Sequence, residues 1–514
     1  MSNIRSALRA PVSAFMLILV ATQLAAQGLG TITFPTSGAP PAQSAFLTGV
    51  KALHNFQFDE AAAAFRDAQR IDPGFALAYW GEAMSYNHPL WNEQNVDAAG
   101  KALQRLAPTH QERLAKARLP KEKALLEAMQ QLYFSPGDKH ARDVAYSQAM
   151  ARMYEQWPED HEIAVLYALS LLGATRPGDP GFKRQALAAA ISQRVFQENP
   201  QHPAAAHFII HAFDDPDHAP LALPAARAYA KIAPASAHAL HMPSHIFVQL
   251  GMWPEVVASN TVAYKAAVDL IARMKLPEGR EDFHALSWLQ YGNLMLGRFD
   301  EAKQNLELAR QSMERNAGNQ NIRESYFRMR ARQILESAQW ENIPLDDPPA
   351  AAGSAGHDAM PGMAGMSGGA YGDMSAWTFV AGVSATKLGN LATAEKAVTQ
   401  LRAMRERVQS KDGERSAKPL AIQEKELAAL VHLANGRKNE AVQLAKEAAD
   451  LELTLPTPSG PPGPIKPALE LYGEVLLEAG QPKEAAAVFE QSLLRTPNRT
   501  PSVMGAKLAA AKLE

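Results

Sequence analysis

The sequence predicts an all-α protein built as a solenoid of repeated helix pairs. The chain has 514 residues, which exceeds what one compact core usually holds and favours several domains or an extended repeat array. Hydrophobic residues make up 47% of the chain and aromatic residues only 7%, and Ala and Leu dominate the long periodic segments. Because Ala and Leu favour helices over sheets, these segments are expected to be helical.

The first 26 residues have the order of a secretory signal peptide. Arg5 and Arg9 are followed by an apolar run at residues 12 to 21 and then by small residues. The run is too short to span a bilayer comfortably, and no later segment reaches about 18 consecutive apolar residues. We expect an exported protein, periplasmic or secreted, with no membrane span in the mature chain and a linker over residues 27–41.

Charge and cysteine content narrow the possible functions. The chain has 51 Lys plus Arg against 53 Asp plus Glu, so it has no basic field that would attract nucleic acid. It has no cysteine, which excludes disulfides and thiolate metal sites. Any bound metal must therefore use His, Met, Asp or Glu.

Five segments begin at a glycine and continue with alternating small and large residues. A glycine can end one helix in a left-handed cap, and small residues let the next helix pack closely on the first. The stretch FQFDEAAAAFRDAQRIDP at 56–73 follows the same scheme without the glycine. The five segments start at Gly251, Gly297, Gly389, Gly436 and Gly480.

These segments resemble the second helix of the tetratricopeptide repeat (TPR), a unit of 34 residues that forms a helix–turn–helix. In the stretch at 56–73, small Ala61, large Phe65, small Ala68 and closing Pro73 stand in the family's places. The resemblance covers most of residues 42–512 and implies an exported, bacterial-type TPR protein that binds a protein or peptide in its concave groove. Weaker units are placed at 76–107, 120–157, 161–200 and 203–236.

A segment without apolar periodicity separates two blocks of repeats. Residues 341–375 are rich in Gly, Pro and Met, a composition that cannot offset the entropy of ordering, so we expect a flexible insert. The first block covers 42–340 and contains His-rich units at 203–290. The second block covers 376–514, and its final stretch SVMGAKLAAAKLE is expected to cap the open end.

Histidine pairs recur at the repeat interval. In HFIIH and HMPSH, His207 and His241 are 34 residues apart, as are His211 and His245. The repeat register places all four on groove-facing positions of first helices. Residues four apart share a helix face, and adjacent helices lie about 8–10 Å apart, so the four imidazoles are predicted to share a zinc, copper or iron ion.

Two observations bear on this hypothesis in opposite directions. Seven of the 15 histidines lie between His202 and His245, which supports a common site. Pro243 lies inside the second pair, and if a helix begins there, His241 falls in the preceding turn and the pairing geometry fails. Neither pair is His-Glu-x-x-His, so no catalytic residue is assigned.

Other candidates are weaker. In HDAMPGMAGM, His357, Met360, Met363 and Met366 suit Cu(I), although Met can equally decorate a flexible insert. Trp80 fits either the groove or a buried packing position. The residues expected to line the groove are Trp80, His88, His238, His284 and Tyr291.

Three functions therefore stay open. The first is an exported scaffold that binds a protein or peptide, the second a metal-binding protein that uses the central histidines, and the third a metal-dependent enzyme whose reaction the sequence does not name. Histidines that converge in the structure, with Pro243 inside a continuous helix, favour the second and third. Histidines that make separate hydrogen bonds favour the first.

Overall fold

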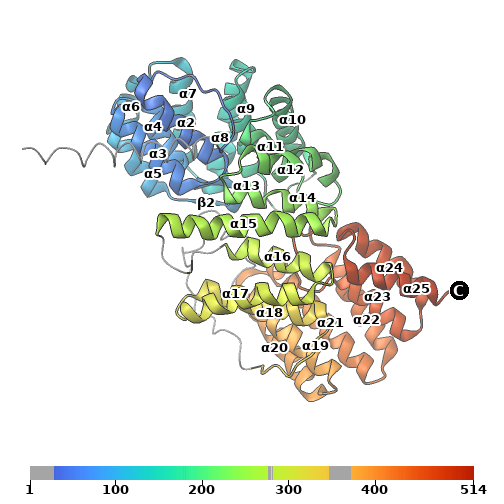
Figure 1. The fold of residues 1–514 in the computed structure, drawn as a ribbon. Coiled ribbons are helices and arrows are strands. Elements are labelled where there is room, and N and C mark those ends of the chain that lie inside the picture. The colour runs from blue at the N-terminus through green and yellow to red at the C-terminus, as the bar shows by residue number, and fades with distance from the viewer. Residues whose placement is uncertain (1–27, 177–178, 180, 276–278, 280–281, 346–371) are drawn as a thin grey trace, which may run out of the picture. The chain divides into compact units, whose positions relative to one another are not determined.

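The computed structural model describes residues 28–176, 179, 181–275, 279, 282–345 and 372–514 (Figure 1). The predicted signal peptide and most of the predicted insert lie outside these residues. The described chain is helical except for loops and one short hairpin, in which Asn87–His88 (β1) pairs with Glu93–Gln94 (β2) around the 3-10 turn Pro89–Trp91 (η1). This confirms the all-α prediction. In the described part, no helix combines the length and apolarity that crossing a membrane requires.

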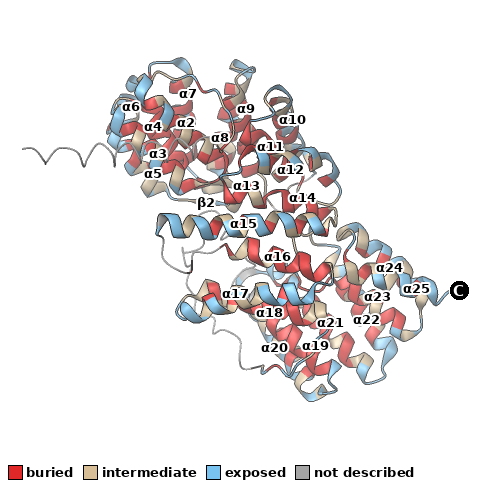
Figure 2. Ribbon diagram, viewed as in Figure 1, coloured by how far each residue is buried: buried red, intermediate tan, exposed pale blue. Residues whose placement is uncertain are grey.

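The helices pack into two compact units. Unit 1 contains the described residues up to Phe213 together with Pro224–Pro243, and unit 2 contains Asp214–Leu223 and Ser244–Glu514. In each unit, buried residues lie along most helices (Figure 2).

Unit 1 is a series of helix pairs in which consecutive helices pack against each other. The pairs are α2 with α3, α4 with α5, α7 with α8, and α9 with α10, and the last three fall within the units placed from the sequence. The helices are α2 (Pro40–His54), α3 (Phe58–Ile71), α4 (Ala76–Met84), α5 (Val96–Leu106), α6 (His110–Lys116), α7 (Pro120–Phe134), α8 (Lys139–Gln156), α9 (His161–Gly173), α10 (Lys183–Glu198), α11 (Pro203–Ala212), most of α12 (Ala219–Ile232), and α13 (Ala237–His241).

Unit 2 repeats the same arrangement, and α25 packs on the last pair as the predicted cap. Trp377 and Phe327, on either side of the predicted insert, share one hydrophobic core and pack edge to face at 5.1 Å. The helices are α14 (Pro243–Gln249), α15 (Trp253–Met274), α16 (Phe283–Met295), α17 (Phe299–Arg315), α18 (Gln320–Ser337), α19 (Gly372–Lys387), α20 (Leu391–Asp412), α21 (Glu414–Ala434), α22 (Lys438–Glu452), α23 (Ala468–Ala479), α24 (Pro482–Arg495) and α25 (Thr500–Ala511).

The helices at each end of the chain pack closely because the phenyl ring of one helix lies against glycines of its two neighbours. A Cβ atom added to Gly49 or Gly81 would lie 2.8 Å or 2.3 Å from the ring of Phe65. At the other end of the chain, a Cβ on Gly473 or Gly505 would lie 2.7 Å or 2.3 Å from the Phe489 ring. The small-then-large pattern of the sequence thus places three helices around one phenyl ring at each end.

Several turns between paired helices use a left-handed residue two positions before the second helix. The five glycines singled out in the sequence all have positive φ, between 62° and 84°, as a left-handed cap requires. In the first pair this place belongs to Phe56, whose φ is 55°. A bulky residue in this conformation is a genuine outlier.

Candidate metal centre

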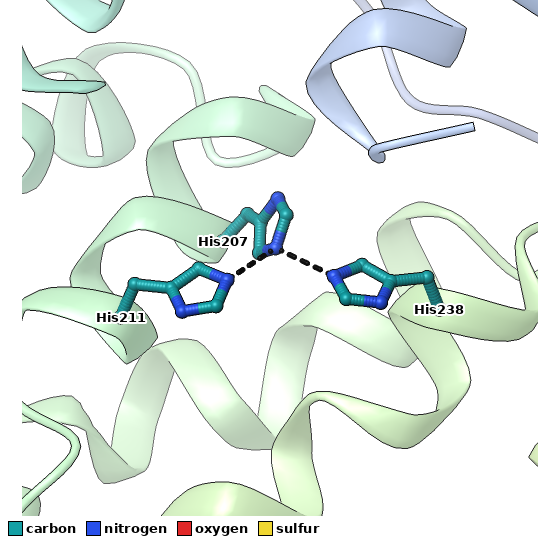
Figure 3. Close-up of side chains that lie close together, drawn as sticks. All are labelled: His207, His211 and His238. Carbon is teal, nitrogen blue, oxygen red and sulfur yellow. Dashed lines mark hydrogen bonds between the residues drawn. The ribbon is translucent and has the colours of Figure 1, made fainter. Parts of the chain in front are cut away.

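Three imidazoles converge in unit 1 (Figure 3). His207 and His211 come from α11, and His238 comes from α13. The Nε2 atom of His207 lies 3.0 Å from Nε2 of His211 and 3.1 Å from Nε2 of His238. In a tetrahedral zinc site with Zn–N bonds of 2.0–2.1 Å, ligand nitrogens are about 3.3 Å apart. The two separations from His207 are close to this spacing, and the ligand nitrogens of all three histidines lie within 4.8 Å of one another.

Local sequence explains how α11 and α13 present these rings. Pro203 occupies the first turn of α11, where its fixed φ favours helix initiation, and the spacing of four puts His207 and His211 on one face. Ser236 caps α13 by accepting a hydrogen bond from the backbone N–H of Ala239. This cap fixes His238 as the second residue of its helix.

The hydrogen bonding of His207 determines which of its nitrogens is available. Its Nδ1 lies 2.7 Å from the backbone carbonyl oxygen of His54. Because a carbonyl oxygen only accepts, Nδ1 carries the proton and Nε2 keeps its lone pair. That lone pair can accept a hydrogen bond from an N–H group of a neighbouring imidazole, or it can bind a cation. In metal-binding histidines, the nitrogen that does not bind the metal commonly donates its N–H to a backbone carbonyl, as Nδ1 of His207 does here.

Aromatic rings surround the cluster. Tyr229 stacks on His207 with centroids 5.0 Å apart, and Trp91 meets His238 edge to face at 6.4 Å. Phe56 contacts all three imidazoles, with centroid distances of 4.4 Å, 5.7 Å and 5.5 Å to His207, His211 and His238. Its left-handed backbone is thus strained at the position where it touches the cluster.

Of the four histidines predicted to share a metal, His207 and His211 belong to this cluster, and its third member is His238. α13 ends at His241 and α14 begins at Pro243. Pro243 therefore separates His241 from His245, which is the arrangement in which the sequence predicted that their helical pairing fails. The boundary between the units also falls between His241 and His245. His241 is buried at the end of α13.

In unit 2, His245 has a carboxylate partner. Its Nδ1 lies 2.7 Å from Oδ2 of Asp214, and its ring centroid lies 6.2 Å from that of His284. Burial, the neighbouring His245 and Arg328 lower the pKa of His284 to about 3, so His284 is neutral at physiological pH.

The predicted groove residues have different surroundings. His88 stacks on Phe58 with centroids 4.0 Å apart and its Nδ1 lies 3.2 Å from Glu93. Trp80 and Tyr291 are each only 1% exposed and pack in the core, so neither lines a groove. Their bulk serves helix packing. The Met-rich candidate of His357, Met360, Met363 and Met366 lies outside the described residues.

A second buried cluster, which the sequence reasoning missed, supports the first. The carboxylate of Glu162 lies 2.7 Å from Nε2 of His54 and 3.2 Å from Nε2 of His202. Burial alone would raise the pKa of Glu162, but the two histidines outweigh it and lower that pKa to about 2. Glu162 thus anchors His54, whose carbonyl orients His207. No sequence motif connects these residues, which are far apart along the chain.

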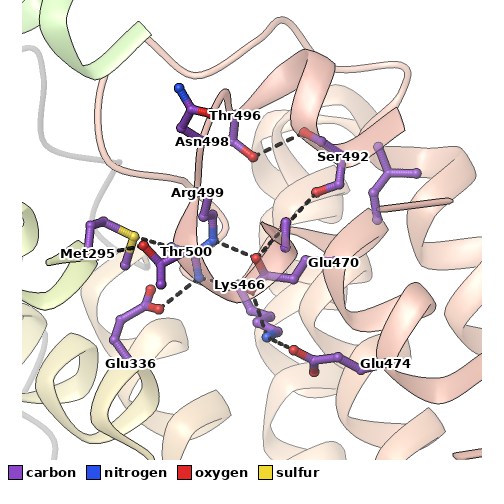
Figure 4. A network of polar contacts seen from close by, with 12 residues as sticks. Met295, Glu336, Lys466, Glu470, Glu474, Ser492, Thr496, Asn498, Arg499 and Thr500 are labelled. Atoms are coloured by element: carbon purple, nitrogen blue, oxygen red, sulfur yellow. Dashed lines mark hydrogen bonds and ion pairs between the residues drawn. The ribbon is translucent and has the colours of Figure 1, made fainter. Parts of the chain in front are cut away.

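A buried polar network in unit 2 is structural (Figure 4). Arg499, the residue before α25, is fully buried and pairs with Glu470 at 2.9 Å and Glu336 at 2.8 Å. Lys466 lies 2.8 Å from Glu470 and 2.6 Å from Glu474. These ion pairs fasten the final helix to α23 and α18.

A proline-rich segment at residues 454–467 lies across first helices of unit 2. Gln249 of α14 donates to the carbonyl oxygen of Pro458 at 2.8 Å, and Arg332 of α18 donates to that of Pro462 at 2.9 Å. Between them, a Cβ on Gly460 would lie 2.4 Å from the ring of Trp288 on α16. This face of unit 2 therefore holds an extended stretch of the chain itself.

Comparisons with known proteins add only fold-level likeness. No protein-family model matches the chain, and no curated protein matches it. Among solved structures, the TPR domain of P58(IPK) is 14% identical with a TM-score of 0.24, covering 92% of this chain and 98% of its own. Yeast Tom70 is 12% identical with a TM-score of 0.34, covering 92% and 96%.

Human IFIT1 is 14% identical with a TM-score of 0.28, covering 92% of this chain and 94% of its own. These TM-scores are low, so the fold assignment rests on the packing of this chain. Paired helices, left-handed turn residues and rings set between glycines make it a TPR-like α-solenoid.

Proposed function

We propose that this protein is an exported, metal-binding α-solenoid whose unit 1 holds one transition-metal ion on His207, His211 and His238. The single observation that carries the proposal is the meeting of three Nε2 atoms, with neighbours 3.0 Å and 3.1 Å apart. Like polar atoms are rarely brought so close unless a shared proton or cation lies between them.

The donor set limits the ion and the chemistry. Neutral imidazoles suit zinc, copper and iron, and three protein ligands leave at least one coordination position for water or a substrate. Such a site can store an ion or activate a bound molecule. The aromatic surroundings of Phe56, Trp91 and Tyr229 would lower water access to that open position.

The direct test is elemental analysis of the protein purified without chelator, before and after incubation with zinc, copper or iron. Wild type is expected to contain close to one ion per chain, and the double variant His207→Ala/His211→Ala is expected to contain none. His161→Ala is the matched control, because His161 lies in the same unit, outside the cluster, beside Glu198. Wild-type protein that takes up none of the three ions would refute the proposal.

Single variants distinguish the cluster in the structure, which includes His238, from the site predicted from sequence spacing, which includes His241. His238→Ala removes the third nitrogen of the cluster and is expected to weaken metal binding at least ten-fold. If the ion instead depended on His241 and not on His238, His241→Ala alone would abolish binding.

Mass analysis of the secreted or periplasmic chain, with an N-terminus expected near residue 27, tests export.

Unit 2 favours a second function, the binding of an extended, proline-rich peptide of a partner protein. The supporting observation is the chain's own segment at 454–467, whose carbonyl oxygens accept hydrogen bonds from Gln249 and Arg332. Donors to backbone carbonyls and an aromatic wall are typical of grooves that recognise proline-rich chains.

A replacement variant tests this second function. Residues 455–464 are exchanged for a Gly/Ser linker of equal length, and a synthetic peptide of the native sequence LPTPSGPPGP is titrated by fluorescence anisotropy. The peptide is expected to bind the variant, to bind wild type more weakly, and to lose affinity when Arg332→Ala is added. Equal, weak binding to all three proteins would rule out peptide recognition by this face.

A further inference from the structure

The turn between α2 and α3 contacts the histidine cluster through three consecutive residues. The carbonyl oxygen of His54 accepts a hydrogen bond from Nδ1 of His207 at 2.7 Å. The side-chain oxygen of Asn55 accepts one from the hydroxyl of Tyr229 at 2.8 Å, and the Tyr229 ring stacks on His207. The ring centroid of Phe56 lies 4.4 Å, 5.7 Å and 5.5 Å from those of the three imidazoles. We call residues 54–56 the cluster turn.

Buried hydrogen bonds hold the cluster turn in place. The backbone N–H of Gln57 donates to the carbonyl oxygen of Ala52 at 2.9 Å, the bond that closes a helix end around a left-handed residue. The side-chain amide of the fully buried Asn55 donates to the carbonyl oxygens of Lys51 at 2.8 Å and Leu29 at 3.3 Å. The turn cannot shift without breaking these bonds, and a lost buried bond is costly.

The ring of Phe56 is itself held by other rings. Its centroid lies 5.3 Å from that of Trp91, 5.4 Å from that of Phe58 and 6.0 Å from that of Phe208. Only 6% of Phe56 is exposed. A ring packed on this many neighbours cannot change its rotamer without displacing them, so it restricts the orientations of the imidazoles that it contacts.

We infer that the cluster turn positions the ligands of the proposed metal site, with Phe56 as the residue that fixes the ring orientations of His207, His211 and His238. This role rests on the metal proposal and adds what holds the three ligands together. An imidazole that rotates freely loses that freedom when it binds an ion, and the loss weakens binding. Rings that are already held lose less, so the cluster turn raises metal affinity although it supplies none of the three ligand nitrogens.

Variants of Phe56 test the contribution of its ring. Zinc and Cu(II) affinities of the full chain are measured by competition with a chromophoric chelator, and the visible absorption of bound Co(II) reports the coordination geometry. Phe56→Gly removes the ring and keeps the left-handed backbone. It is expected to weaken binding about ten-fold or more and to change the Co(II) spectrum. Phe56→Tyr, which keeps the ring, is expected to restore most of the affinity and the wild-type spectrum.

Phe75→Ala is the matched control for the ring. Phe75 is a 1% exposed residue of unit 1 that precedes α4, and its ring packs against Phe46 with centroids 4.9 Å apart. The change should lower the stability of the metal-free protein, because it removes a buried ring. It should leave metal affinity and the Co(II) spectrum unaltered.

Tyr229→Phe tests the cluster turn by a second route. It keeps the ring that stacks on His207 and removes only the hydroxyl that bonds Asn55. Metal affinity is expected to fall about five-fold, the worth of one hydrogen bond. Tyr133→Phe is its control, because it removes a buried hydroxyl that donates to the carbonyl oxygen of Ala83 at 2.6 Å and should lose stability without losing metal affinity.

Equal affinities and Co(II) spectra of wild type and a folded Phe56→Gly would overturn the positioning role. Losses of affinity as large in the two controls as in their partner variants would overturn it too, because affinity would then merely follow stability. If Phe56→Gly does not fold, the comparison of Tyr229→Phe with Tyr133→Phe decides. Wild type that binds neither ion would end the metal proposal and this role together, whereas binding that no variant weakens would end this role alone.

Discussion

Phe56 shows at the level of one residue how the histidine cluster is built into the repeat. The turn before the second helix requires positive φ, and the five later turns use glycine there. Unit 1 places a phenyl ring at this point instead and directs it against three imidazoles. Glycine at this position would adopt the left-handed backbone without strain. Backbone strain that is kept where glycine would avoid it is characteristic of functional sites.

The left-handed backbone predicts an unusual order of stability for variants of Phe56. Both Phe56→Ala and Phe56→Gly lose the buried ring, but only Gly relieves the backbone. We therefore expect Phe56→Gly to be about 1 kcal/mol more stable than Phe56→Ala. Chemical denaturation measures the difference. At Ala68, a buried helical residue of α3, Gly should instead be less stable than Ala, and equal stabilities at position 56 would contradict a strained Phe56.

Glu162 predicts a pH dependence of stability. Its pKa is lowered to about 2 in the folded state, below the ordinary 4.5, so its contribution is fully present above pH 4.5 and is lost as pH falls toward 2. Glu162→Gln should cost about 3 kcal/mol at pH 7 and progressively less below pH 4.5. Denaturant titrations between pH 7 and 3 measure this, with the exposed Glu159 as control site. A penalty independent of pH would show that the charge of Glu162 does not stabilise the fold.

At the level of helices, the sequence predicted the fold well because its signals are local. A glycine, a small residue and a large residue at fixed spacing determine where a helix ends and how closely the next one packs. The final stretch, which the sequence predicted to be helical, forms α25. By contrast, periodicity could not separate Trp80 and Tyr291 from groove residues, because burial depends on neighbours outside their own repeat.

The same reasoning explains which neighbours in the histidine cluster the sequence could indicate. His207 and His211 share a helix, so their spacing of four sufficed. The third histidine of the cluster depends on how α13 lies against α11, which residue spacing does not determine. The structure has His238 there, where the spacing predicted His241. The supporting Glu162 and His202 come from tertiary packing alone.

The ring set between glycines gives a prediction for α25. A Cβ on Gly505 would lie 2.3 Å from the Phe489 ring, so Gly505→Ala should cost about 1–3 kcal/mol and loosen the final helix. Hydrogen exchange along α25 measures the loosening. Adding Phe489→Leu should recover part of the loss, whereas Ala at Gly505 without any effect on exchange would mean that the ring has room to move.

For the whole molecule, the two units predict separate responses to mutation. Arg499→Ala leaves the buried carboxylates of Glu470 and Glu336 without their partner, and such losses cost about 3–5 kcal/mol. The change should lower the unfolding temperature of unit 2 and leave that of unit 1 unaltered in calorimetry. Arg310→Ala, at an exposed surface pair of α17, is the control. An equal shift of all transitions would show that the units unfold as one.

The proline-rich segment also sets an order of events during synthesis. The chain grows from its N-terminus, so Gln249, Trp288 and Arg332 exist long before the stretch at 454–467 that they contact. Until the ribosome has passed residue 467, this face cannot hold that segment. In a nascent or C-terminally truncated chain this face is therefore not covered by the 454–467 segment. A chaperone that binds the unfinished chain is then the first protein that can contact it.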